Sequence, residues 1–157
     1  MHTRIPFALL TTLVFLTACN SEPPGPKLVP VQGAVTLDGK PLSAADVMFI
    51  PQGDTKGQGG VGRTDESGKF EILSFDRKHK GAPVGNYRVI VSKLVKPDGT
   101  DYIPDPNAGP FDTGGFKELL PAAYRDSDTA QSRLAADVPD SGTTTIELKL
   151  SSKVRSQ

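Results

Sequence analysis

The sequence has 157 residues with 18 basic and 18 acidic side chains, so its formal net charge is zero. This balance excludes the strongly basic surface that nucleic-acid binding requires, and we expect no nucleic-acid partner. A single cysteine excludes an internal disulfide, while 36% hydrophobic residues, 16 glycines and 14 prolines indicate one turn-rich domain of short strands.

Residues 1–18 have the pattern of a secretory signal peptide. Arg4 precedes a charge-free, mostly apolar run over residues 5–16, which is shorter than the roughly 20 residues that span a bilayer. The segment LTAC that ends at Cys19 resembles the bacterial lipobox. That resemblance implies cleavage between Ala18 and Cys19, with a diacylglycerol on the cysteine thiol and often a further acyl chain such as palmitate on the new N-terminus.

Two other interpretations of Cys19 remain open. The residue can be a chance cysteine near the end of an ordinary signal peptide, or a structural cysteine in the core. A lipid on Cys19 would anchor the protein to a membrane of the cell envelope, with the domain outside the cytoplasm, because two or more acyl chains hold a protein stably. Asn20 is not the aspartate known as a retention signal in some lipoproteins, so the inner and outer membranes both remain open.

The mature chain divides into three parts. Residues 19–30 are rich in proline and predict an extended tether, residues 31–150 predict one domain, and residues 151–157 form a polar tail. Alternating or buried apolar patterns predict strands over 31–37, 47–50, 61–64, 69–73, 86–93, 134–138 and 144–150. We expect the third and fourth of these to form a hairpin, and the whole to be a seven-strand antiparallel β-sandwich.

The irregular segment over residues 96–116 is the main candidate for function, because long loops in compact domains are often functional. Its aromatic residues Tyr102, Phe111 and Phe116 predict either a contact surface for a partner or a flap over the sandwich. Its aspartates do not have the spacing of a calcium loop, so we expect no metal site. The following segment 118–124 predicts a short turn packed by Leu119, Leu120 and Tyr124.

Two further segments have features of ligand sites. The glycines of residues 53–60 lack the Gly-Lys-Ser/Thr ending of a phosphate loop, which favours a hairpin loop. The basic run over residues 77–80 can be an anion or glycan contact, but a solvated loop is the more common case.

Several motifs resemble those of carboxypeptidase regulatory-like domains. Residues 31–42 (VQGAVTLDGKPL) resemble the first hairpin of that family. A Thr-Asp-x-x-Gly-x-Phe segment is matched by Thr64, Asp65, Gly68 and Phe70, and a Pro-x-Gly-x-Tyr-x-Val segment by Pro83, Gly85, Tyr87 and Val89. The late block LLPAAY resembles lipoproteins of the planctomycete type that carry this domain. The resemblance implies a transthyretin-like, seven-strand Greek-key sandwich that serves as an accessory or interaction module, without catalytic residues.

The residues offer little for catalysis. The mature chain has one histidine, His79, which cannot supply the histidines of hydroxyisourate hydrolases, of intradiol dioxygenases or of a zinc carboxypeptidase site. We therefore expect no enzyme and no cofactor. The expected function is a lipid-anchored structural or protein-interaction module of the envelope. The alternative is a glycan-binding module that uses Tyr102, Phe111 and Phe116, with a hydrolase as the least favoured case.

Overall fold

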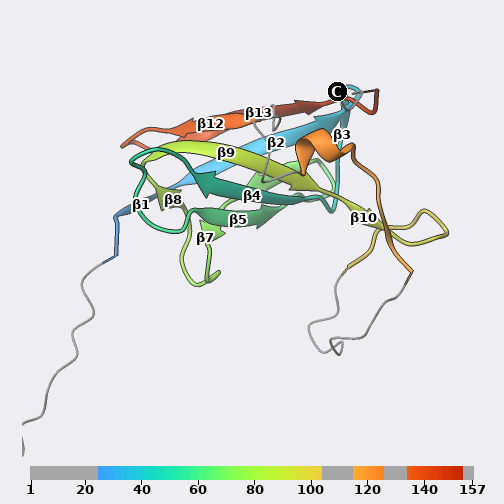
Figure 1. Ribbon diagram of the computed structural model, residues 1–157, viewed down its shortest axis with the longest axis horizontal. Coiled ribbons are helices and arrows are strands. Elements are labelled where there is room, and N and C mark those ends of the chain that lie inside the picture. Colours follow the sequence, from blue (N-terminus) through green and yellow to red (C-terminus); the bar gives the residue numbers. More distant parts are fainter. Residues whose placement is uncertain (1–24, 104–114, 126–133, 154–157) are drawn as a thin grey trace, which may run out of the picture.

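The computed structural model describes residues 25–103, 115–125 and 134–153, and these ranges form an all-β fold (Figure 1). They contain strands and one 3-10 turn but no α-helix, which confirms the all-β part of the predicted fold class. Within these ranges no helix is long and apolar enough to cross a membrane. Ala18, Cys19 and Phe111 lie outside the described residues, so the expectations about them stay predictions.

The larger sheet has five strands, and every neighbouring pair in it is antiparallel. In spatial order they are β12 (Ala135–Val138), β9 (Gly85–Ser92), β4 (Asp46–Pro51), β5 (Gly60–Arg63) and β7 (Leu73–Ser74). The glycine-rich segment 53–60 connects β4 to β5, as the hairpin interpretation predicted.

The second sheet is built around β2 (Val31–Leu37), whose bounds match the alternating segment of the sequence. One edge of β2 pairs with β13 (Thr143–Leu150), and the other is shared by β3 (Lys40–Pro41) and β6 (Lys69–Glu71). The pairing of β13 with β2 is parallel, so the expectation of a wholly antiparallel fold is wrong at this edge.

Two small strand pairs extend beyond the main sheets. Near the beginning of the described chain, β1 (Leu28–Val29) pairs with β8 (Ala82–Pro83). Beyond the end of β9, β10 (Leu94–Val95) pairs with β11 (Lys117–Glu118), and the 3-10 turn Ala122–Tyr124 follows. The described residues thus contain thirteen strands, several of only two residues, rather than the seven expected.

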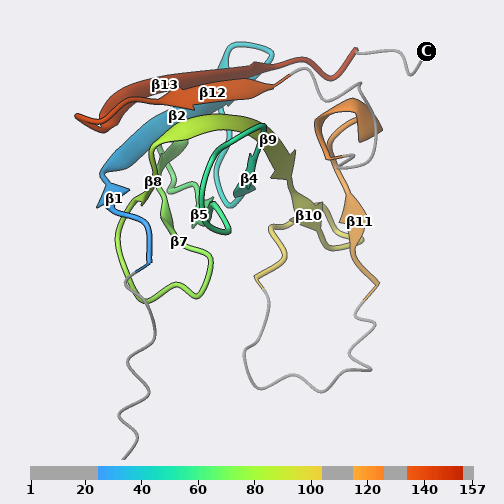
Figure 2. The ribbon, with the colours of Figure 1, turned by 60° about the vertical axis from the view of Figure 1, so that its left-hand side comes forward.

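The two main sheets face each other across one apolar core (Figures 1 and 2). The ring of Phe49 from β4 lies 6.3 Å from that of Phe70 in β6 and 5.5 Å from that of Tyr87 in β9. Inward side chains alternate along β9, where Tyr87, Val89 and Val91 are buried. The period-two pattern of the sequence therefore identified the core-facing positions of this strand.

The hairpin expected over residues 61–73 is wrong in its second half. β5 pairs with β7 through Val61 and Leu73, but β6 pairs instead with β2 of the opposite sheet. The reason lies at Thr64, which is buried and bonded to the segment before β4: its Oγ1 accepts from the backbone N–H of Ala45 at 2.8 Å. The chain therefore crosses from one sheet to the other at this corner.

Three smaller expectations also need correction. Val29 was assigned to the tether, but it is 3% exposed and belongs to the core, so the packed chain begins before residue 31. Met48 is exposed, so only one face of β4 is fully buried. In the turn after β11, Leu120 and Tyr124 are buried as expected, whereas Leu119 is exposed.

Candidate interaction surface

Two described segments lie between β9 and the 3-10 turn, residues 94–103 and 115–119, and we call these two segments the extension. Figure 2 shows β10 and β11 set to one side of the main sheets. Its first part is a tight turn in which the N–H of Lys96 donates to the carbonyl of Thr100 at 2.8 Å. The hydroxyl and N–H of Thr100 bond the carboxylate of Asp98 and hold its pKa below the usual value. This part of the predicted irregular loop is therefore ordered.

The structure brings together two of the three predicted contact residues. The rings of Tyr102 and Phe116 lie 4.6 Å apart in a tilted arrangement, within the range of favourable aromatic pairs. The third, Phe111, is outside the described residues. The two aromatic residues lie on opposite arms of the extension, so their contact joins the outgoing chain to the returning one.

The extension carries several exposed apolar side chains. Among the described residues, five large apolar side chains are exposed, and three of these belong to it: Ile103 at 73%, Phe116 at 41% and Leu119 at 45%. Phe116 contacts the ring of Tyr102, the residue that precedes Ile103, while Ile103 itself lines a hollow with Arg63 and Leu73. Exposed apolar side chains are common at protein contact sites.

An ion pair fixes the extension to the end of the sandwich. Lys93, directly after β9, has a side chain only 8% exposed, and its Nζ lies 2.7 Å from Oδ1 of Asp101. The same ammonium donates to the carbonyl of Ser43 at 2.7 Å. Because a buried ammonium is costly unless it is paired and hydrogen-bonded, this arrangement holds the tight turn in one position.

The returning arm is fixed by the carboxylate of Glu118. Its Oε1 accepts from the backbone N–H groups of Lys93 and Leu120, both at 2.9 Å, and its Oε2 accepts from the hydroxyl of Ser92. Hydrogen bonds to an ionised acceptor are stronger than those between neutral groups. One carboxylate thus joins β9, β11 and the following turn.

A third contact comes from β5. Arg63 donates through Nη1 to Asp46 at 3.1 Å and through Nη2 to the carbonyl of Tyr102 at 2.9 Å. The guanidinium therefore connects the larger sheet with the residue that carries the aromatic pair. Together, Lys93, Glu118 and Arg63 fix the two segments that carry the exposed apolar side chains to the main sheets.

These supporting residues were not predicted from the sequence, although the position of one of them, Lys93, indicates a buried partner. Lys93 continues the inward phase of Tyr87, Val89 and Val91 along the same alternating strand. A lysine at an inward position requires an anionic or carbonyl partner. No comparable pattern marks Glu118 or Arg63, since both stand at the ends of short strands.

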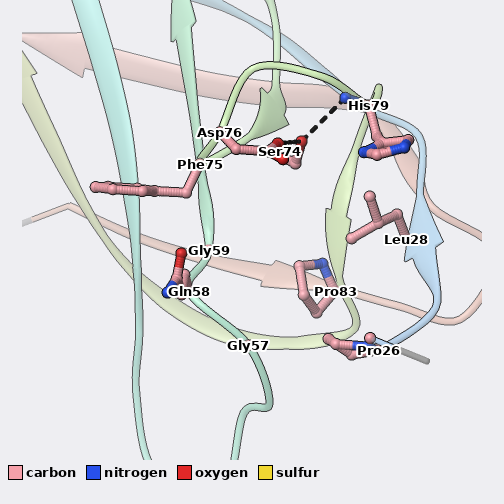
Figure 3. Close-up of a pocket in the computed structure, with 11 residues that line it drawn as sticks. Pro26, Leu28, Gly57, Gln58, Gly59, Ser74, Phe75, Asp76, His79 and Pro83 are labelled. Carbon is pink, nitrogen blue, oxygen red and sulfur yellow. Dashed lines mark hydrogen bonds between the residues drawn. The ribbon is translucent and has the colours of Figure 1, made fainter. Parts of the chain in front are cut away.

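A hollow with a volume of about 540 Å³ lies beside β1, apart from the extension (Figure 3). Its lining includes Ser74, Asp76 and His79, the three residue types of a hydrolytic triad. However, the hydroxyl of Ser74 donates to Asp76 at 2.6 Å and accepts from the backbone N–H of His79 at 3.0 Å. A triad requires the imidazole itself to take the serine proton, so these contacts form a loop rather than a nucleophile and base.

The described ranges contain no group of three or more His, Cys, Asp or Glu side chains placed to hold a metal ion. Comparisons of the chain with protein-family models, with curated proteins and with solved structures found no match. A function for this chain is therefore inferred from the geometry of the extension and of the hollow.

Proposed function

We propose that this chain is a lipid-anchored, non-catalytic module of the bacterial cell envelope that binds another envelope protein through the extension. The observation that carries the proposal is the exposed apolar group Ile103, Phe116 and Leu119. In the sequence, the proposed lipid attachment at Cys19 would place this surface outside the cytoplasm.

Rigidity of the support favours a protein partner. Binding is opposed by the entropy lost when side chains and loops become ordered, so a surface fixed beforehand loses less. The ion pair of Lys93 with Asp101 and the hydrogen bonds of Glu118 provide this support. Exposed aliphatic and aromatic groups on such a base resemble the anchors of protein interfaces.

Glycan binding is the alternative, and the aromatic pair disfavours it. Sugar rings stack on a presented aromatic face, but Tyr102 is only partly exposed and contacts the ring of Phe116. Ile103 and Leu119 add aliphatic surface, which offers no hydrogen bonds to hydroxyl groups. The composition of this surface is therefore more suited to a protein.

We also propose that the fold is a transthyretin-like Greek key of the carboxypeptidase regulatory-like family. The motif glycines Gly39 and Gly68 occupy turns with φ of 79° and 76°, where other residues are strained. The motif aromatics Phe70 and Tyr87 lie in the core. These positions support the resemblance as one of turn and core residues.

Site-directed photocrosslinking in the native membrane-bound protein tests the protein-binding function. A photoreactive amino acid replaces Phe116 in one variant and Met48 in the control, because Met48 is similarly exposed at 37% but lies on β4. We expect one discrete protein adduct from position 116, weakened at least fivefold by Ile103→Ser, and none from position 48. Equal labelling from both positions, or an adduct degraded by glycosidases, would contradict a specific protein partner.

The lipid anchor has a separate test. Cys19→Ser removes the thiol that would carry the diacylglycerol, so the protein should move from the membrane fraction to the soluble fraction after cell breakage. Ala18→Cys or other nearby changes are less informative because they alter signal cleavage as well. Unchanged membrane retention of Cys19→Ser at high salt would refute the anchor.

A further inference from the structure

The described chain begins at the hollow shown in Figure 3. Gly25, Pro26 and Leu28 form one wall of this hollow, and the segment after β7 forms another. Because β1 pairs with β8, the emerging chain is fixed to the domain at this place. The proposed tether therefore joins the domain beside the loop of residues 75–80, which we call the basic loop.

The basic loop combines an apolar side chain with positive charge. Phe75 is 52% exposed and stands at the border of the hollow, with its ring pointing away from Ser74 and His79 (Figure 3). The loop contains three cations, Arg77, Lys78 and Lys80, against one anion, Asp76. Another cation, Lys27, is exposed on the segment that leads into β1. An exposed aromatic residue among basic side chains is the chemistry that favours an anionic lipid surface.

The loop is held in shape by short contacts. The carboxylate of Asp76 accepts from the hydroxyl of Ser74 and from the N–H of Lys78 at 3.1 Å, and these bonds lower its pKa. The N–H of Arg77 donates to the carbonyl of Ser74 at 2.7 Å, and Arg77 itself has a φ of 60°. Asp76 is therefore engaged within the loop, where it also lies 4.0 Å from Nζ of Lys78, and Lys80 forms an ion pair with Glu71 at 3.0 Å. The side chains of Lys78 and Lys80 are about three-quarters exposed, so these surface pairs are weak and can be exchanged for contacts with lipid phosphate.

The length of the tether limits how far this end can move from the membrane. Six peptide steps separate Cys19 from Gly25 (25 − 19 = 6), and a fully extended chain covers at most roughly 3.6 Å per residue, or about 22 Å here. Charges attract over a Debye length of about 8 Å at physiological salt. A domain held this closely repeatedly brings its basic loop within range of the lipid headgroups.

We propose that the basic loop binds anionic phospholipid headgroups of the membrane to which the tether is attached. Phe75 would enter the headgroup region while Arg77, Lys78 and Lys80 contact phosphate groups. This inference rests on the lipid anchor of the proposed function. Its consequence is a fixed orientation in which the basic loop faces the membrane, and Ile103 of the extension, which lines one hollow together with Arg77, lies near the lipid surface.

The test uses the full mature lipoprotein in vesicles of phosphatidylcholine, with or without phosphatidylglycerol. An environment-sensitive fluorophore is attached through His79→Cys, which leaves Phe75 and the cations in place. Since Cys19 is the only natural cysteine and would be blocked by lipid, the new thiol is the only one to react. The control reporter is Thr145→Cys, an exposed position on β13.

We expect the emission of the position-79 reporter to shift to shorter wavelength only with phosphatidylglycerol and to return in 0.5 M salt, while the position-145 reporter does not change. Arg77→Asn with Lys78→Gln should lower the ratio of bound to unbound loop about thirtyfold, since each charge contributes roughly fivefold. Asparagine suits the positive φ of Arg77. The control pair Lys40→Gln with Lys69→Gln removes two exposed charges elsewhere and should have little effect.

Two failures can be distinguished. If the protein floats with the vesicles but the emission at position 79 is the same on both lipid compositions, the surface contact is refuted and the anchor stands. If the protein does not float and Cys19 reacts with the fluorophore, the anchor is refuted, and the membrane contact with it. Loss of the shift in Phe75→Ser would assign the insertion to that side chain, while an unchanged shift would refute its part in binding.

Discussion

The ammonium of Lys93 lies 2.7 Å from a carboxylate oxygen of Asp101, and the two residues have very different access to water. The side chain of Lys93 is 8% exposed, whereas that of Asp101 is 36% exposed. The cost in stability therefore depends on which of the two partners is removed. A lone Asp101 can be hydrated, but a lone Lys93 keeps only the carbonyl of Ser43.

This asymmetry gives the first prediction. Asp101→Asn should lower the free energy of unfolding by about 2 kcal/mol, because a buried charge loses its counter-ion. Lys93→Met should cost less than about 1 kcal/mol, since an apolar side chain of similar length fills the same space. Urea unfolding of both variants measures the difference, and a larger loss for Lys93→Met would contradict the account.

The corner at which the chain changes sheets gives the second prediction. Thr64→Val keeps the shape of the side chain but removes the oxygen that accepts from the N–H of Ala45. A buried N–H without a partner costs roughly 1–3 kcal/mol, so we expect a loss of that size. Thr64→Ser retains the acceptor and should lose clearly less stability. Equal losses in urea unfolding would show that the hydrogen bond is unimportant.

The centre of β2 gives the third prediction. A Cβ on Gly33 would meet the carbonyl oxygen of Ile146 and the ring of Phe70 at separations well below van der Waals contact. Gly33→Ala should therefore destabilise the domain by about 3 kcal/mol or more, since backbone cannot move aside cheaply. Gly25→Ala is the control, because nothing lies within 4 Å of its added Cβ. Similar midpoints of thermal unfolding for the two variants would contradict the packing described.

The phenol of Tyr87 gives a prediction on pH. Burial raises its pKa to about 12 from the usual 10, so folding favours the neutral phenol. Its contribution is fully present below about pH 10 and is lost as the pH rises towards 12, a change of about 2–3 kcal/mol. Tyr87→Phe removes this titration together with the hydrogen bond to the carbonyl of Pro83. The loss of stability between pH 8 and 11.5 should be smaller in Tyr87→Phe; an equal loss would refute the assignment.

Much of the fold could be predicted from the sequence because alternation identifies the face of a strand. The patterns over 31–37, 86–93, 134–138 and 144–150 match β2, β9, β12 and β13 closely. Alternation does not identify the partner of a strand, however. Phe70 points inward whether β6 pairs with β5 or with β2, so the change of sheet after Thr64 and the parallel pairing of β13 could not be derived.

The candidate surface was predictable only in part, because a sequence pattern does not identify which residues meet across the fold. The aromatic residues of the loop identified Tyr102 and Phe116, but their contact depends on β10 pairing with β11, two strands of two residues each. The supporting contacts of Glu118 and Arg63 depend on side chains that meet across long separations in sequence. Of the supporting residues, only Lys93 could be predicted to have a buried partner, because it stands at an inward position of its strand.

Both proposals rest on a lipid at Cys19, so the most direct test is the mass of the N-terminal tryptic peptide of the protein isolated from membranes. Trypsin should release residues 19–27, which end at Lys27. We predict a peptide that begins at Cys19 and carries the added mass of a diacylglyceryl group, with or without an N-linked acyl chain. A mature N-terminus at any other residue, or residues 19–27 with an unmodified thiol, would contradict the account.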